Sequence, residues 1–194
     1  SLPIGTVWDN AVWAEQREKP DAEYTAFKAD ARKQISPGDW LPLKEKPLGE
    51  AGAMLSLQCL AARQKFIDKG GPAHECCAKN DPAPVDNTDN ANSVVTLLKF
   101  GEFDFLDTGD LTRNREFDLA CPKNRAGTVD ASQASHHGLD VSNHPALVRS
   151  IEPHVAIVNN GVTKGNMPLM FATLQETPSI KAVYQMHKTL REDG

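Results

Sequence analysis

The chain has 194 residues and a net charge of −5, with 40% hydrophobic and 24% charged residues. This length and composition predict one soluble globular domain over residues 1–194, large enough to bury a core. No apolar run approaches the roughly 20 residues that span a bilayer, and no signal peptide is visible, so we expect no membrane partner and a cytoplasmic location. The 21 lysines and arginines are scattered, which argues against nucleic acid as a partner.

The first third of the chain predicts small elements. Residues 5–8 favour a short strand, and 21–33 favour a helix whose acidic start and basic end suit the helix dipole. Trp8 and Trp13 are predicted core anchors, because large aromatic side chains bury much apolar area. Further along, we expect a turn at 36–39, a brief strand at 40–43, a loop at 44–52, and either a strand or the start of a helix at 53–60.

Residues 70–92 are rich in glycine, proline, asparagine and aspartate, and predict a long acidic loop. Such a loop could act as a lid or supply oxygen ligands to a hard cation, but the glycine and glutamate positions of an EF-hand are missing. A solvated loop is the simpler interpretation. The run from His74 to Cys77 could chelate a metal, yet two adjacent cysteines suit tetrahedral ligation poorly, so we expect inert or partly buried thiols.

The strongest pattern lies in the middle of the chain. Two apolar runs at 94–100 and 103–106 flank a short turn and predict a β-hairpin. The second run ends in the sequence DTGD at 107–110, and a further short strand at 129–134 ends in SHHG at 135–138. Loops at strand ends are where layered α/β folds bind their ligands.

Asp110, His136 and His137 are therefore the candidate catalytic and metal-binding residues. If the two strand ends meet at one edge of a sheet, a carboxylate and two imidazoles meet there as well. These groups suit a divalent cation, or a general base beside an orienting carboxylate. His144, His154 and His187 lack partners at ligand spacing, and we expect them to be structural.

The last third of the chain alternates predicted helices and strands. We expect helices at 114–119, 143–151 and 167–174, and strands at 155–158 and 182–186. Ser142 or Asn143 would cap the second of these helices, with Pro145 in its first turn. The alternation implies an α/β fold, with α+β layers packed on one sheet.

FLDTGDL followed by SHHG, a helix, and a strand ending near Asn160 resembles the C-terminal half of metallo-β-lactamase-fold hydrolases. Within that family the pattern is most similar to the ComEC-like branch of DNA-uptake competence proteins. The resemblance covers roughly residues 90–187 and implies a truncated αββα fold. It also implies that Asp110 ligates or bridges metal ions, and that His136 or His137 is the family's later histidine ligand.

The family's H-x-H-x-D-H motif is absent, since only His74 precedes residue 136. The chain thus resembles a family member without its N-terminal strands and first ligands. The resemblance implies zinc, which prefers three or four nitrogen and sulfur donors. The remaining donors suit a loosely held calcium or manganese ion better. A homodimer could cover the sheet edge that the missing strands would leave open.

These features together predict a metal-dependent hydrolase that opens a small ester or lactone. An acyl-homoserine lactone, the substrate of bacterial quorum-quenching lactonases, is the favoured example, because a neutral apolar substrate tolerates an acidic protein without a phosphate clamp. One alternative is a DNA phosphodiesterase of the ComEC-like type, disfavoured by the net charge and the missing motif. The other is a non-catalytic remnant of the fold that binds a ligand in the same pocket.

Overall fold

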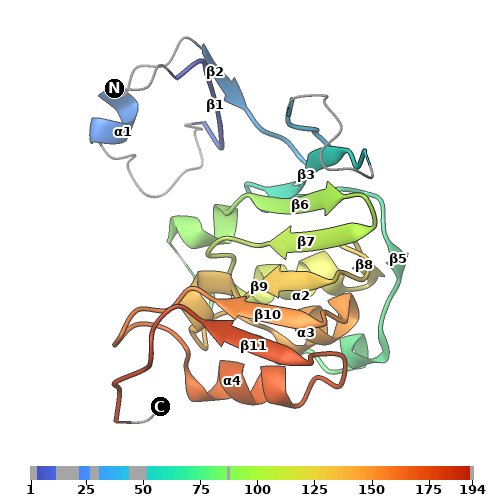
Figure 1. Ribbon diagram of the computed structural model, residues 1–194, viewed down its shortest axis with the longest axis vertical. Coiled ribbons are helices and arrows are strands. Elements are labelled where there is room, and N and C mark those ends of the chain that lie inside the picture. Colours follow the sequence, from blue (N-terminus) through green and yellow to red (C-terminus); the bar gives the residue numbers. More distant parts are fainter. Residues whose placement is uncertain (1–3, 12–21, 27–30, 44–51, 87, 193–194) are drawn as a thin grey trace.

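The computed structural model of the protein describes residues 4–11, 22–26, 31–43, 52–86 and 88–192 (Figure 1). Within these ranges, a seven-stranded mixed sheet and four α-helices form a layered fold, which confirms the predicted α/β class. The strand order is β11-β10-β9-β7-β6-β3-β4. The strands are β3 (Leu55–Ala62), β4 (Lys65–Phe66), β6 (Val95–Phe100), β7 (Phe103–Asp107), β9 (Ala131–Gln133), β10 (Val155–Val158) and β11 (Ala182–Gln185).

Helices and two small sheets complete the described elements. The α-helices are α1 (Ala22–Ala26), α2 (Arg113–Ala120), α3 (Pro145–Ile151) and α4 (Pro168–Gln175), and the 3-10 turns are η1 (Glu75–Ala78), η2 (Asp89–Asn92) and η3 (Ser135–Gly138). The small sheets pair β1 (Thr6–Asp9) with β2 (Ala31–Gln34), and β5 (Gly71–Pro72) with β8 (Lys123–Asn124). Among the described residues, no helix has the length and apolar character that crossing a bilayer requires.

The sheet changes from antiparallel to parallel at β7. On one side, β6 and β7 form the predicted hairpin, with Phe100 opposite Phe103 and Gly101 at a positive φ of 62° in the turn. On the other side, β9 and β10 continue the sheet in parallel to β7. The chain therefore leaves β7, β9 and β10 at the same edge of the sheet. That edge carries the candidate site.

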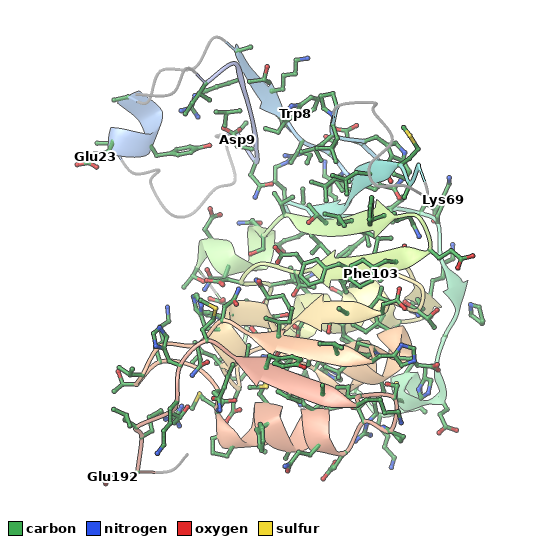
Figure 2. All side chains as sticks on the ribbon, in the orientation of Figure 1. Trp8, Asp9, Glu23, Lys69, Phe103 and Glu192 are labelled. Atoms are coloured by element: carbon green, nitrogen blue, oxygen red, sulfur yellow. A yellow bond between two sulfur atoms is a disulfide. The ribbon has the colours of Figure 1, made fainter. Side chains whose placement is uncertain are left out.

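The core lies between the sheet and the helices that cover it. One cluster joins Leu97 and Leu106 of the hairpin to Leu119 of α2 and Leu147 of α3. A second cluster packs α4 on β10. Each buried leucine or isoleucine stabilises the fold by about 2 kcal/mol relative to an exposed one. Trp8, labelled in Figure 2, is only partly buried and packs against a third, smaller cluster, so it is not the core anchor that was predicted, whereas Trp13 lies outside the described residues.

Several local predictions need correction or completion. Residues 31–34 form strand β2, paired in parallel with β1, so the predicted helix over 21–33 is wrong there, although α1 falls within its first half. The ambiguous run at 53–60 belongs to strand β3, and Trp40 forms a single bridge to Gln58. Helix α3 is capped by His144, whose ring accepts a hydrogen bond from the Ala146 amide, and by neither Ser142 nor Asn143. Most of the loop predicted at 44–52 lies outside the described residues.

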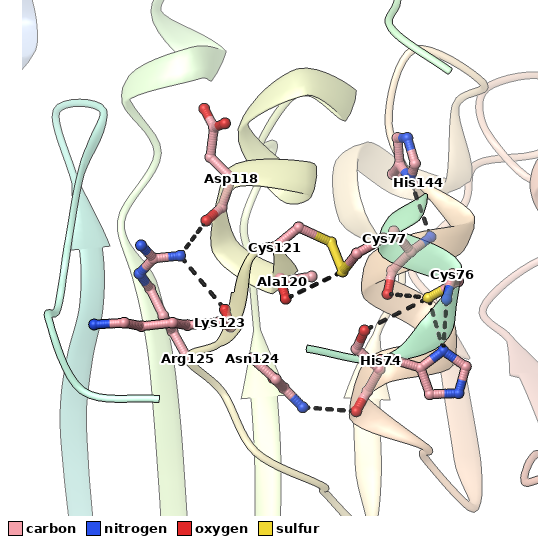
Figure 3. The surroundings of a disulfide bond; sticks show 12 residues. His74, Cys76, Cys77, Asp118, Ala120, Cys121, Lys123, Asn124, Arg125 and His144 are labelled. Carbon is pink, nitrogen blue, oxygen red and sulfur yellow. Dashed lines mark hydrogen bonds between the residues drawn. A yellow bond between two sulfur atoms is a disulfide. The ribbon is translucent and has the colours of Figure 1, made fainter. Parts of the chain in front are cut away.

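The expectation of inert or partly buried thiols in the run from His74 to Cys77 is wrong for Cys77, because this cysteine forms a disulfide with Cys121 (Figure 3). The bond joins η1 to the residue that ends α2, across 44 positions of sequence. Cys59 is a buried free thiol and Cys76 a partly exposed one. With the β5–β8 pairing, the disulfide anchors the predicted long loop to the helices at two places.

Removing the disulfide should destabilise the fold. Closing a loop of this length restricts the unfolded chain and contributes about 4 kcal/mol in the chain-entropy model. We expect the double variant Cys77→Ser/Cys121→Ser to lose roughly that free energy of unfolding in urea titrations. Cys76→Ser is the matched control, because it removes a neighbouring thiol and leaves the bridge intact. Equal stabilities of the double variant and the wild type would contradict the assignment of the bond.

Candidate functional site

Two loops meet at the edge where β7 and β9 end. The DTGD loop follows β7, and the SHHG turn η3 follows β9. The His136 amide donates to the Gly109 carbonyl at 2.9 Å, so the loops are joined through their backbones. The structure thereby places Asp110, His136 and His137 together, and we call this cluster the Asp–His site.

The two imidazoles lie on either side of the Asp110 carboxylate. His136 Nε2 is 3.8 Å from one carboxylate oxygen, and His137 Nε2 is 3.8 Å from the other. The His136 side chain is 13% exposed, compared with 36% for His137 and 38% for Asp110. The site is therefore open to solvent on the side of Asp110 and His137, while His136 forms its more buried wall.

The hydrogen bonding of His137 fixes which ring nitrogen carries the proton. Its Nδ1 lies 3.0 Å from the Asn159 carbonyl oxygen, and a carbonyl only accepts hydrogen bonds. In the neutral ring Nδ1 is therefore protonated, and an unprotonated Nε2 faces the Asp110 carboxylate. Two acceptors facing each other leave a place for a cation or for a water that donates to both. Metal-binding histidines carry the same kind of hydrogen bond on their distal nitrogen.

His136 differs from His137 in its surroundings. Burial lowers the pKa of His136, although the negative charge of Asp110 opposes the shift. The ring is consequently neutral near pH 7 and able to accept a proton. Its Nδ1 is buried and has no hydrogen-bond partner among the described residues. The Asp86 carboxylate also raises the pKa of His136, which brings one acidic residue of the 70–92 segment into the electrostatics of the site.

The turn that carries the histidines has a strained backbone. His136 and His137 have φ angles of 51° and 59°, in the left-handed region that non-glycine residues seldom occupy. The segment after β10 holds the turn in place, since the Asn166 amide donates to the His137 carbonyl at 3.0 Å. A side chain at Gly165 would put its Cβ 2.0 Å from that carbonyl oxygen. Only glycine allows this close approach.

Several polar residues that were not predicted from the sequence form hydrogen bonds beside the Asp–His site. Asp107 accepts hydrogen bonds from the Gly109 amide at 2.8 Å and from the Gln133 amide group at 3.2 Å. Gln133 accepts in turn from the Asn159 side chain at 2.5 Å. The chain of bonds ends at the residue whose carbonyl orients His137. The sequence does contain a signal for these residues, because a polar residue stands at or directly after the end of each of the adjacent strands β7, β9 and β10.

A buried glutamate ties the loops to the helices. Glu116 of α2 is fully buried and accepts a hydrogen bond from Ser135 Oγ at 2.5 Å and one from the His144 amide at 2.7 Å. Since Ser135 donates to Glu116, Thr108 donates to Ser135 at 2.5 Å. Burial raises the pKa of Glu116 to about 7. No sequence signal set this glutamate apart from the charged residues on the exposed face of a helix.

The donor chemistry of the site fits a divalent cation, but the arrangement is incomplete. Imidazole nitrogen and carboxylate oxygen are ligands of zinc and of other first-row metals. Among the described residues, however, no group of three or more histidine, cysteine, aspartate or glutamate side chains is arranged to hold an ion. Asp110 and His137 offer a pair of ligands, with His136 beside them.

Comparison with known proteins adds no independent evidence. No protein-family model matches this sequence, and no curated protein sequence is significantly similar to it. The resemblance to metallo-β-lactamase-fold hydrolases therefore rests on the DTGD and SHHG motifs alone and remains a prediction.

Glu116 should make stability depend on pH in a defined direction. Its pKa is higher in the folded state than the ordinary 4.5, so its contribution is fully present below pH 4.5 and is lost as pH rises through about 7. Glu116→Gln removes this loss, because the amide cannot ionise. We expect the variant to gain up to about 3 kcal/mol relative to the wild type between pH 4.5 and pH 8, measured by urea unfolding.

Glu176→Gln is the matched control for this experiment, because the Glu176 side chain is 69% exposed. Its stability should follow the wild type at every pH. Parallel pH profiles for Glu116→Gln and the wild type would show that Glu116 does not titrate as a buried acid.

Proposed function

We propose that the protein is a metal-dependent hydrolase that opens a small ester or lactone at the Asp–His site. The observation that carries the proposal is the orientation of His137, whose Nδ1–H is held by the Asn159 carbonyl while its Nε2 faces Asp110. A surface histidine with only a structural role would not need an Nε2 that faces a carboxylate. The motifs that resemble metallo-β-lactamase-fold hydrolases supply the reaction class.

Each residue of the Asp–His site has a separate role in the proposed reaction. Asp110 and His137 would hold a divalent cation, which when bound polarises a carbonyl and lowers the pKa of water. His136 is neutral because of its burial, and it accepts a proton from the attacking water at Nε2. The water oxygen bonds to the carbonyl carbon, the ring C–O bond breaks, and His136 returns the proton to the departing alkoxide. The product is the open hydroxy acid.

The ligands of the Asp–His site indicate the cation, and the charge and exposed edge of the protein indicate its partners. Zinc is the ion implied by the family resemblance, whereas the scarcity of nitrogen ligands favours a weakly held calcium or manganese ion. We propose a neutral substrate such as an acyl-homoserine lactone and no nucleic-acid partner, because the chain is acidic. Strand β11 forms one edge of the sheet, with Tyr184 exposed on it and Met186 exposed directly after it, and a homodimer would cover these side chains.

The cellular compartment is a further part of the proposal. The cytoplasmic location expected from the sequence stays a prediction. The Cys77–Cys121 disulfide favours an oxidising compartment instead, because cytosolic proteins usually keep their thiols reduced.

A non-catalytic remnant of the fold is the rival candidate, and one observation favours it. The described residues contain no complete metal-binding cluster. Such a protein would bind a small molecule at the Asp–His site without turning it over. Binding without turnover would therefore support the remnant, and salt-sensitive cleavage of DNA would support the ComEC-like phosphodiesterase.

The test is a lactone ring-opening assay combined with metal analysis of the purified protein. We expect EDTA to abolish turnover, zinc, manganese or calcium to restore it, and Asp110→Ala or His137→Ala each to lower it on the order of 100-fold. His154→Ala is the matched control. It removes a histidine that also lies near an aspartate, Asp130, at 3.9 Å, but before β10 at the opposite edge of the sheet. Equal turnover in His137→Ala and His154→Ala would overturn the proposal.

A further inference from the structure

A second site lies apart from the Asp–His site. A cavity of about 510 Å³ opens between η1 and the N-terminal ends of α2 and α3, and none of Asp110, His136 and His137 lines it. We call it the η1–α3 cavity. Its volume falls in the range of about 300–1,000 Å³ that small-molecule sites occupy. The proposed hydrolase activity gives this cavity no role.

A thiol and an imidazole form a close pair in its wall. Cys76 Sγ lies 2.9 Å from His74 Nδ1, which also accepts a hydrogen bond from the Cys76 amide at 3.2 Å (Figure 3). His74 Nδ1 is therefore the unprotonated ring nitrogen, and the thiol can donate its proton to it. The Ala146 carbonyl and the Ser150 hydroxyl lie farther from the sulfur, at 3.5 Å and 3.7 Å. A thiol beside an imidazole acceptor is the arrangement that activates nucleophilic cysteines.

The cavity also carries positive charge. Lys79, Arg113 and Arg149 line it, against two acidic residues, Glu75 and Asp81. Arg149 is paired with Glu176, whose side chain is 69% exposed, and Arg113 is paired with Asp81, whose side chain is 82% exposed. Ion pairs of such exposure contribute little, so an anionic ligand can compete for these guanidinium groups. The lining thus favours a ligand with carboxylate groups.

A buried hydrogen-bond donor in the lining is left without an acceptor. His144 is 1% exposed and lines the cavity. Its Nδ1 accepts from the Ala146 amide at 2.9 Å, so Nε2 carries the proton of the neutral ring. That Nε2–H has no hydrogen-bond partner among the described residues. Buried polar groups are rarely left unpaired, and an acceptor atom of a ligand would satisfy this one.

We propose that Cys76 is a modification site that reacts with small anionic disulfides bound in the η1–α3 cavity. The thiol passes its proton to His74, and the Cys76 sulfur attacks one sulfur of the ligand. A new S–S bond forms to Cys76, the S–S bond of the ligand breaks, and the departing thiolate takes the proton from His74. The products are a mixed disulfide on Cys76 and one free small thiol, and the disulfide ligand is the only oxidant.

Two reagents of opposite character test this site on the intact, disulfide-bonded protein. Dithiobis(nitrobenzoate) is an anionic aromatic disulfide, and dithiodipyridine is a neutral one. We expect one thiol per chain to react under native conditions, and Cys76→Ser to abolish the reaction. Cys59→Ser should leave it unchanged, because Cys59 is fully buried. His74→Gln should slow both reagents on the order of tenfold.

The charge of the cavity is tested by comparing the two reagents. Lys79→Gln should slow the anionic reagent several-fold and leave the neutral one unchanged. Lys188→Gln, a change of an exposed lysine outside the cavity lining, is the matched control and should alter neither rate. Peptide mapping should place the adduct on Cys76. An unchanged rate in His74→Gln, no selective loss in Lys79→Gln, or an adduct on Cys77 or Cys121 would each overturn the proposal.

Discussion

The parallel pairing of β7 with β9 is the constraint on which the rest of the site depends. The two strands share only a short register, with Phe105 opposite Ala131 and Leu106 opposite Ser132. Their contact is extended beyond the strands by the backbone hydrogen bond from His136 to Gly109. Because parallel neighbours end at the same edge, a carboxylate and two imidazoles that are more than 20 residues apart in the chain become neighbours.

Buried polar groups then fix what the pairing brings together. Glu116 accepts from Ser135 and from the His144 amide, so α2, η3 and α3 are joined at one carboxylate. Leaving any of these buried groups without a hydrogen-bond partner would cost about 1–3 kcal/mol. Because moving one group would break the hydrogen bonds of the others, the network stays rigid as a unit. On the exposed side, the Asn159 carbonyl sets the His137 ring. The network therefore holds the strained turn in which both histidines have positive φ angles.

The sequence predicted the parts of this structure that depend on local patterns. The hairpin, the helices α2, α3 and α4, and the later strands follow from apolar periodicity and turn residues, and strand ends indicated Asp110, His136 and His137. What depends on distant contacts was not predictable. The pairing of the cysteines cannot be deduced from their spacing in the sequence. The sequence around a buried glutamate such as Glu116 does not differ from that around an exposed one. In residues 31–33, the pairing of the chain with β1 overrode a helical sequence pattern.

The central claim is the proposal that the neutral His137 ring turns an unprotonated Nε2 toward the Asp110 carboxylate, where a cation would bind. Two-bond ¹H–¹⁵N correlation spectra of the histidine rings test it most directly, because they distinguish the two neutral tautomers. The account predicts that the neutral His137 ring carries its proton on Nδ1 and that its Nε2 resonance shifts when zinc or manganese is added. In Asp110→Ala the metal-induced shift should be lost, while the proton should stay on Nδ1. A proton on Nε2, or spectra of His137 that no divalent cation alters, would contradict the account.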